Sequence, residues 1–159
     1  MPNTNDKITL SRIINKFSDY YNTPKFEPHI TILGGFLAKE TESIKNLKLL
    51  SKKIRPFEIQ FLKVSYMNEY FRSIFIEVML SDKLKELRIL TCNYFGFINK
   101  TYYPHLSLVY CDLVIPEKLK MIKCLGPIPK SIFIDKLFLA QNNETDYKWK
   151  IIESIDLNL

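Results

Sequence analysis

The chain has 159 residues, a formal net charge of +6 and 47% hydrophobic residues, which fits one globular domain or two small joined lobes. No apolar run approaches the roughly 18 residues that span a membrane, and the first residues lack the pattern of a secretory signal. The three cysteines form no CxxC pair, so we expect reduced thiols and a cytoplasmic protein rather than a disulfide framework or a zinc site. The positive charge favours an anionic partner such as a nucleotide or RNA.

Hydrophobic periodicity predicts alternating helices and strands along the chain. Ser81 or Asp82 is the expected cap of the third helix, and the polar turn Asn142-Asn143-Glu144 is expected to join the last two strands. In chain order the predicted elements are a helix over 8–20, a strand over 28–36, a helix over 40–53, strands over 57–65 and 72–80, a helix over 82–97, a strand over 103–110, a helix over 116–123 and strands over 131–140 and 147–157.

The same order of elements occurs twice, in repeat units over about 8–80 and 82–157. At residue level the segment over 26–33, FEPHITIL, matches the segment over 102–109, YYPHLSLV, close to half a chain length further on. Internal repetition of this kind predicts a symmetric fold. We therefore expect a single bilobal α+β domain over 1–159. Its two pseudo-symmetric lobes, each a mainly antiparallel sheet with flanking helices, are expected to surround a central cleft that receives both histidine strands.

The only two histidines, His29 and His105, both lie in the pattern Pro-His-aliphatic-hydroxyl-aliphatic. Proline makes up about 5% of residues, so a proline before both histidines is rare by chance. Residues i and i+2 of a strand point to the same face, which places His29 beside Thr31 and His105 beside Ser107. The aliphatic neighbours then point into the core. A purely structural role is the competing interpretation for either motif alone, and the doubled motif opposes it.

Two imidazoles and two hydroxyls around one small volume suit the hydrolysis of a phosphodiester. One neutral imidazole can take a proton from water while one protonated imidazole gives a proton to the leaving oxygen, because the pKa of histidine lies near 6.5. The hydroxyl groups can stabilise the charge on the phosphate oxygens. The sequence shows no evident cluster of His, Asp and Glu for a metal ion, so no metal or other cofactor is expected.

The doubled motif resembles the two-histidine phosphoesterase superfamily, whose members have duplicated α+β lobes around a cleft. The segments over 26–31, 70–75 and 104–110 are most similar to the cyclic phosphodiesterases of plants and fungi. The resemblance implies hydrolysis of ADP-ribose 1″,2″-cyclic phosphate to ADP-ribose 1″-phosphate, a by-product step of tRNA splicing. It also implies hydrolysis of nucleoside 2′,3′-cyclic phosphates to 2′-phosphates.

The resemblance also implies roles for the motif residues. His29 with Thr31 is the first catalytic pair, and His105 with Ser107 is the second. By the family pattern His105 is the base that activates water, and His29 is the acid.

Three further residues match positions of the family's substrate site, and a fourth, Arg72, is a candidate because of its charge. Tyr110 matches a tyrosine of the family's site, but its odd spacing from the second histidine places it on the other strand face unless the strand ends or bulges there. Core packing is the alternative for this residue. Tyr70 and Phe71 match an aromatic position that stacks on a base, with ordinary strand-end aromatics as the alternative. Arg72 is a candidate to bind phosphate or a common surface arginine.

Relatives generally begin with an aromatic-rich strand that residues 1–6 do not show, so either this strand is lost or the chain starts later than its relatives. The first lobe is then expected to lack a strand and to have an exposed edge. The expected partner is a small cyclic nucleotide or ADP-ribose cyclic phosphate, or an RNA end, bound by a monomer. Scattered lysines favour a small nucleotide. An alternative is an RNA 2′,3′-cyclic or 2′,5′-phosphodiesterase, or a cyclic-oligonucleotide hydrolase, of the same superfamily. Others are a non-catalytic nucleotide- or RNA-binding module and a structural domain with coincidental motifs.

Overall fold

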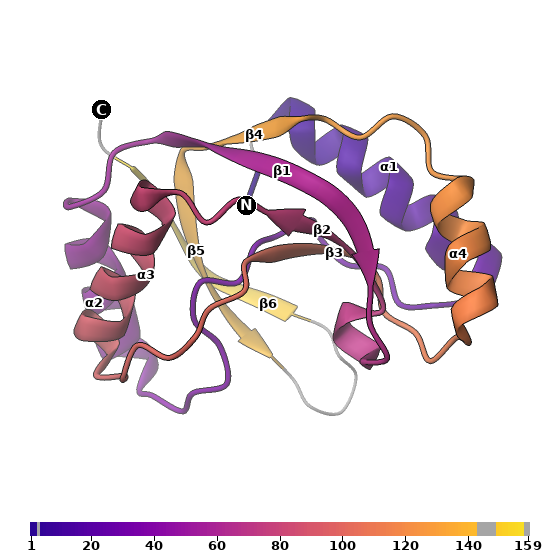
Figure 1. Cartoon of the computed structure of the whole chain (residues 1–159). Coiled ribbons are helices and arrows are strands. Elements are labelled where there is room, and N and C mark those ends of the chain that lie inside the picture. The colour runs from indigo at the N-terminus through magenta and orange to yellow at the C-terminus, as the bar shows by residue number, and fades with distance from the viewer. Residues whose placement is uncertain (3, 143–148, 158–159) are drawn as a thin grey trace.

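The computed structural model describes residues 1–2, 4–142 and 149–157 (Figure 1). Helices and strands alternate in it, and its strands pair antiparallel, which confirms the α+β class. The elements are helix α1 (Thr4–Tyr21), helix α2 (Glu40–Ser51), strand β1 (Phe57–Tyr66), the 3₁₀ turn η1 (Tyr70–Arg72), strand β2 (Ile74–Val78), helix α3 (Asp82–Phe95), strand β3 (His105–Val109), helix α4 (Ile115–Lys123), strand β4 (Ser131–Ile134), strand β5 (Lys136–Asn142) and strand β6 (Trp149–Asp156).

The first lobe is a four-stranded antiparallel sheet with the strand order β3-β2-β1-β4. Helix α1 lies against β3, and α1 and α4 are at the same end of the molecule (Figure 1). In α1 the residues Leu10, Ile14 and Phe17 recur at helical spacing, so they share one face, and all three are buried. This face belongs to the hydrophobic core that also contains the buried side chains of the sheet.

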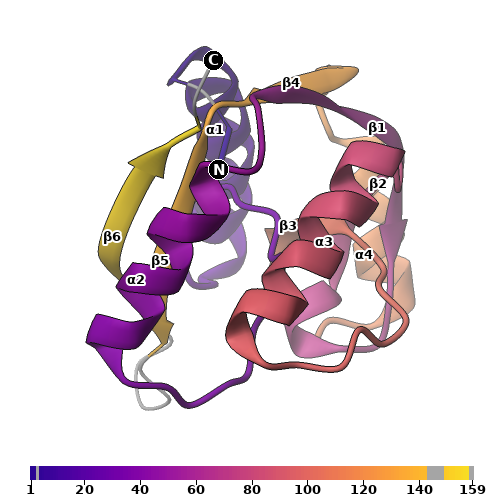
Figure 2. The ribbon, with the colours of Figure 1, turned by 90° about the vertical axis from the view of Figure 1, so that its left-hand side faces the viewer.

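The second lobe is the two-stranded sheet β5-β6 together with helices α2 and α3. Figure 2 shows α2 and α3 side by side, with β5 and β6 next to α2. Helix α3 begins after Ser81, whose hydroxyl accepts a hydrogen bond from the Leu84 N–H at 3.3 Å, and it ends at Gly96 with a φ of 72°. Of the two residues that the sequence offered as cap, Ser81 is therefore the one used.

Both lobes contain segments from both halves of the sequence. Strands β1 and β2 of the first half pair with β4 and β3 of the second half. Helix α2 of the first half packs against α3, β5 and β6 of the second. The chain therefore crosses between the lobes repeatedly, and this crossing brings the two motif segments to the middle of the molecule.

The predicted strand over 28–36 is wrong. Within this segment the structure has only an isolated antiparallel bridge, between Ile30 and Leu106. The carbonyl groups of the next two residues accept hydrogen bonds from side chains instead of from a neighbouring strand. The segment is therefore held beside β3 without becoming part of the sheet.

The predicted strand over 131–140 is two strands, β4 and β5, which belong to different sheets. Ile132 and Ile134 are buried at even positions and Leu137 at an odd one, so the inward face changes between β4 and β5. Asp135 lies at this change, where its carbonyl accepts a hydrogen bond from a residue after β6. The chain passes from the first lobe to the second at this point.

The other differences are smaller. The strand over 72–80 begins only at Ile74, because Tyr70–Arg72 form the 3₁₀ turn η1. Asn142 ends β5, while the other two residues of the predicted turn lie outside the described residues. No strand precedes α1 in the described part, and β5 pairs there with β6 alone. None of the helices described combines the length and the apolar character that crossing a membrane needs.

Candidate active site

The isolated bridge between Ile30 and Leu106 brings the two motif segments side by side. In an antiparallel pair, the residue before one partner lies across from the residue after the other. His29 therefore lies across from Ser107, and the second histidine lies across from the hydroxyl residue of the first motif. Leu106 is fully buried, so alternation directs the two histidines and their hydroxyl partners to the opposite face.

His29 is held on both sides of its ring. Its Nδ1 lies 2.6 Å from the carbonyl oxygen of Glu27, which fixes Nδ1 as the donor and leaves Nε2 as an acceptor. Nε2 lies 3.4 Å from the hydroxyl of Tyr110, and the ring of Trp149 packs on the imidazole with 3.9 Å between ring centres. The ring has one orientation and one tautomer, with its basic nitrogen toward the site.

The surroundings of His29 disfavour its charged form. The residue is only 9% exposed, and burial lowers its pKa to about 4, against a smaller raising effect of the hydrogen bond to the Glu27 carbonyl. The charges of the N-terminal ammonium group and of His105 lower the pKa further, by smaller amounts. His29 is therefore neutral near pH 7 in the unliganded protein.

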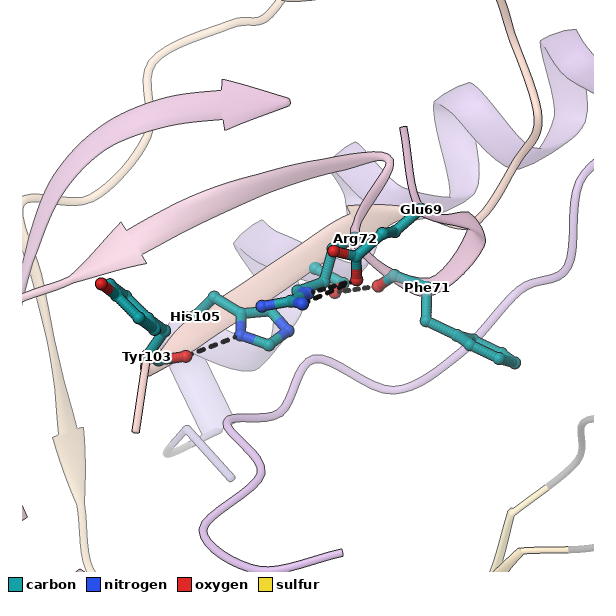
Figure 3. Close-up of polar contacts among 6 residues, drawn as sticks. Glu69, Phe71, Arg72, Tyr103 and His105 are labelled. Carbon is teal, nitrogen blue, oxygen red and sulfur yellow. Dashed lines mark hydrogen bonds and ion pairs between the residues drawn. The ribbon is translucent and has the colours of Figure 1, made fainter. Parts of the chain in front are cut away.

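His105 is held in the same way but is less enclosed. Its Nδ1 donates to the carbonyl oxygen of Tyr103 at 3.0 Å, two residues back as in the first motif (Figure 3). The ring is half-buried, and burial lowers its pKa, while the Tyr103 carbonyl raises it. Arg72 lowers and Glu69 raises the pKa by smaller amounts. Both motifs thus fix Nδ1 on a carbonyl and leave Nε2 for chemistry.

Arg72 lies beside the second histidine, and its role in phosphate binding stays a prediction. Its Nε and Nη2 donate to the same Glu69 carboxylate oxygen at 2.9 and 2.6 Å. Figure 3 shows the guanidinium group next to the His105 ring. The turn η1 therefore presents a charged pair at the edge of the site.

The two hydroxyl groups have different surroundings. Ser107 is 4% exposed, and its hydroxyl donates to the carbonyl oxygen of Phe71 at 2.8 Å. Thr31 is exposed, and its γ-methyl lies 3.3 Å from where a Cβ on Gly34 would be, so glycine leaves room for it. The first hydroxyl is open to a ligand, whereas the second is joined to η1.

Tyr110 reaches the site because β3 bulges and then ends. The pairs Phe75–Ser107 and Ile74–Val109 leave one extra residue in β3, and the strand stops at Val109. Tyr110 consequently turns toward the first histidine. The sequence analysis placed Tyr110 at the site only if the strand bulged or ended there, and both occur. Burial raises the pKa of its hydroxyl, opposed in part by a hydrogen bond with Ser107, so it stays protonated.

Aromatic rings pack around Tyr110. Phe26 stacks on Tyr110 with 3.9 Å between ring centres, and Phe71 meets Tyr110 edge to face at 5.3 Å. Tyr70 lies 6.4 Å from the same ring. Phe71 is 48% exposed, and its ring points away from His105 in Figure 3. The predicted aromatic residues therefore gather around Tyr110 but lie on η1, not at a strand end.

A cavity of about 650 Å³ opens on the first motif. Its lining includes His29, Thr31, Gly34, Phe36 and Trp149. Trp149, the only tryptophan of the chain, is 40% exposed, so one face covers the histidine while part of the ring remains available. The sequence analysis missed this residue, and its only signal was a large aromatic between two lysines at the start of the last strand.

The described residues contain no group of three or more His, Cys, Asp and Glu side chains that could hold a metal ion. The charges that act on the pKa of His29 are those of the N-terminal ammonium group and His105, and the charges that act on the pKa of His105 are those of Arg72 and Glu69.

Comparison with known proteins identifies relatives in several organisms. An uncharacterized protein of Schizosaccharomyces pombe is 25% identical over 138 residues, which cover 79% of this chain and 66% of that protein. The cyclic phosphodiesterase of Arabidopsis thaliana is 22% identical over 119 residues, which cover 74% of this chain and 66% of the plant enzyme. The match thus spans slightly less than two thirds of each relative.

The fold is that of Escherichia coli LigT, whose structure with 3′-AMP superposes with a TM-score of 0.61 at 12% identity, over 94% of this chain and 92% of LigT. LigT has also been solved with ATP and with NADP⁺. A sequence model of the family described as "cyclic phosphodiesterase-like protein" matches residues 1–157. The chain therefore belongs to the cyclic phosphodiesterase-like protein family, within the two-histidine phosphoesterase superfamily.

Proposed function

We propose that the protein is a metal-independent cyclic phosphodiesterase. Its substrates are small cyclic phosphates: ADP-ribose 1″,2″-cyclic phosphate, opened to ADP-ribose 1″-phosphate, and nucleoside 2′,3′-cyclic phosphates, opened to 2′-phosphates. The observation that supports this most directly is the antiparallel bridge that places the two Pro-His-x-hydroxyl segments side by side. Membership of the family and the name of the plant relative agree with the proposal.

The proposed reaction needs one proton acceptor and one proton donor. For a 2′,3′-cyclic phosphate, neutral His105 takes a proton from water through Nε2, and the water oxygen bonds to phosphorus. The bond between phosphorus and O3′ breaks as protonated His29 gives its Nε2 proton to the leaving oxygen. The net change is the addition of one water. The hydroxyl of Thr31 donates to the phosphate oxygens, where negative charge is stabilised. The hydroxyl of Ser107 does the same by exchanging its hydrogen bond to the Phe71 carbonyl for one to phosphate.

The order of acid and base depends on the bound substrate. Burial keeps His29 neutral near pH 7 in the unliganded protein, so His29 acts as the acid only if a nearby phosphate charge raises its pKa. His105 is less buried and lies next to Arg72. Comparing the pH–rate profiles of His29→Ala and His105→Ala tests this order, because removal of the base abolishes the limb on the acid side.

A small substrate fits the site better than a long RNA. The cavity beside the first motif has a volume of about 650 Å³, and its lining includes His29 and Thr31 but not His105 or Ser107. This volume lies in the usual range for small-molecule sites, roughly 300–1,000 Å³. LigT, with the same fold, binds 3′-AMP, ATP and NADP⁺ in its structures.

Several residues are proposed to contact the substrate. Tyr110 and Trp149 flank His29 and are placed to bind the ribose or base beside the phosphate. Phe71 and Tyr70 extend the aromatic surface on η1, and bases stack on such surfaces without sequence preference. Arg72 is proposed to exchange its contact with Glu69 for one with phosphate.

Phosphorus NMR of reactions in EDTA tests the choice of substrate. We expect ring opening of ADP-ribose 1″,2″-cyclic phosphate and of a nucleoside 2′,3′-cyclic phosphate. Thr31→Val should lose activity, and Thr9→Val, on an exposed position of α1, should not. Turnover only of linear or cyclic oligonucleotides assigns the chain to another branch of the superfamily. Binding without any turnover indicates a non-catalytic module.

A further inference from the structure

The first motif needs support that its backbone does not provide. Only Ile30 of the segment forms a bridge to β3, so the following carbonyl groups have no strand partner. The carbonyl groups of Thr31, which is exposed, and Ile32, which is half-buried, accept hydrogen bonds from side chains instead. These partners come from elements far along the chain.

Two side chains hold consecutive carbonyl groups of the segment. The hydroxyl of Tyr102 donates to the carbonyl oxygen of Thr31 at 2.9 Å. Nη1 of Arg88 donates to the carbonyl oxygen of Ile32 at 2.5 Å, and its Nε donates to Asn99 Oδ1 at 3.3 Å. The guanidinium group also lies over the Tyr102 ring, 5.1 Å from its centre. The two side chains therefore brace each other as well as the backbone.

Both donors keep their protons under ordinary conditions. Burial raises the pKa of the Tyr102 hydroxyl, and the charge of Arg88 offsets only part of this effect. Arginine remains charged in proteins, and hydrogen bonds from a charged donor are roughly twice as strong as neutral ones. The two contacts are thus present across the whole pH range of the proposed reaction.

The position of Tyr102 connects the two motifs. It lies in the segment that leads directly into β3 and His105, while its hydroxyl holds the residue that carries the first motif's hydroxyl. Arg88 projects from α3 to the next carbonyl, just before the chain turns at Gly35 with a φ of 72°. The placement of Thr31 relative to the second histidine therefore depends on these two side chains.

We propose that Arg88 and Tyr102 are positioning residues that hold the Thr31 backbone so that its hydroxyl meets the reacting phosphate. This inference rests on the proposed function. Neither side chain needs to touch substrate. Both side chains affect the reaction rate through Thr31, whose hydroxyl stabilises the phosphate charge that is greatest in the transition state.

Tyr102→Phe is the sharpest test, because it removes one hydroxyl and leaves the ring under Arg88. We expect kcat to fall by about tenfold with KM nearly unchanged, since a small misplacement weakens transition-state binding most. Tyr20→Phe, at an 80% exposed position of α1, should leave both constants unchanged. In a Thr31→Val background Tyr102→Phe should cost little more, because the hydroxyl that it positions is already absent. If Tyr102→Phe lowers kcat by the same factor in the wild-type and Thr31→Val backgrounds, the proposal is overturned.

A second measurement does not depend on catalysis. We expect lower ¹⁵N order parameters for the amides of residues 31–33 in Tyr102→Phe and Arg88→Met, with those of α1 unchanged. Arg88→Lys, which keeps a charged donor, should restore part of the order. Unchanged order at 31–33 in both variants contradicts the positioning role. If the wild-type protein opens no cyclic phosphate, the proposed function fails, while the order parameters still decide whether these side chains hold the segment.

Discussion

The two histidines have matching hydrogen bonds but unequal surroundings. Each donates Nδ1–H to the carbonyl group two residues earlier. His29 lies between Trp149 and Tyr110 and is nearly buried, whereas His105 is half-buried next to Arg72. A duplicated motif has therefore produced two bases of different strength, which is useful where one ring must give and the other must take a proton.

The lowered pKa values predict an acidic optimum for kcat/KM. This constant reports on the free enzyme and is largest between the pKa values of the two histidines, because one ring must hold a proton and the other must lack it. Burial lowers both values from 6.5, that of His29 to about 4. We expect a pH profile of kcat/KM with its maximum below 6.5, falling as the pH rises past the higher value. A maximum above pH 7 contradicts these surroundings.

Trp149 is expected to affect both binding and the pKa of His29. Trp149→Ala removes the ring that packs on the imidazole, so water enters and the pKa of His29 should rise toward 6.5. Loss of a stacking surface should also raise KM for a nucleoside cyclic phosphate by about tenfold. Imidazole NMR titration and steady-state kinetics measure the two effects. Trp149→Phe keeps a ring, so the pKa of His29 and the KM should stay close to those of the wild type. An unchanged pKa of His29 in Trp149→Ala argues that Trp149 does not shield the imidazole from water.

At this scale the sequence predicts residues whose relation is local. The doubled motif indicates that His29 and Thr31 act together, because i and i+2 share a face whether the backbone is a full strand or a single bridge. Tyr110 was predictable only on condition of a bulge, which the sequence does not reveal. The contacts of Trp149 and Tyr102 with the first motif join distant parts of the chain, and no local pattern encodes them.

At the scale of elements, helices were the most predictable because each has a stripe of apolar residues at helical spacing. The strand over 28–36 was mispredicted because the segment has the apolar alternation of a strand but pairs with β3 only through the bridge at Ile30. Its next two carbonyl groups accept hydrogen bonds from side chains. The strand over 131–140 contains a change of inward face at Asp135. That change is visible in the sequence as a break in alternation and could have indicated two strands.

The cap of α3 gives a prediction at this scale. Ser81→Ala removes the hydroxyl that accepts from Leu84 N–H and should lower the free energy of unfolding by about 1 kcal/mol. Asp82→Asn should cost only a few tenths of a kcal/mol, since its carboxylate makes only an exposed contact with Lys85. Denaturant titration measures both. Equal losses for the two variants contradict the choice of Ser81 as cap.

The whole molecule is bound together by the crossing of its two halves. The four-stranded sheet combines β1 and β2 of the first half with β3 and β4 of the second, and α2 of the first half packs against α3, β5 and β6 of the second. The bridge between Ile30 and Leu106 joins the halves once more. Internal repetition in the sequence predicted two matching lobes, whereas the described residues form one four-stranded and one two-stranded sheet. The symmetry of the lobes therefore stays a prediction. Neither lobe can form from one half of the chain alone, because the first lobe takes strands from both halves and the second takes helix α2 from the first half.

This crossing predicts a single unfolding transition. Trp149 is the only tryptophan and lies in the second lobe, so its fluorescence reports on that lobe, whereas far-UV circular dichroism reports on all helices and strands. We expect the two signals to change together in urea, as in two-state unfolding. Loss of the fluorescence signal at a clearly lower urea concentration would show that the second lobe unfolds by itself.

The central claim is that the two facing histidines open a cyclic phosphate without a metal. Phosphorus NMR of a nucleoside 2′,3′-cyclic phosphate in EDTA, with wild-type protein, His29→Ala and His105→Ala, tests it most directly. We expect conversion to the 2′-phosphate by the wild type and a loss of at least about a hundredfold in each variant, because each removes one proton-transfer group. Full activity in either variant, or wild-type activity that EDTA abolishes, contradicts the account.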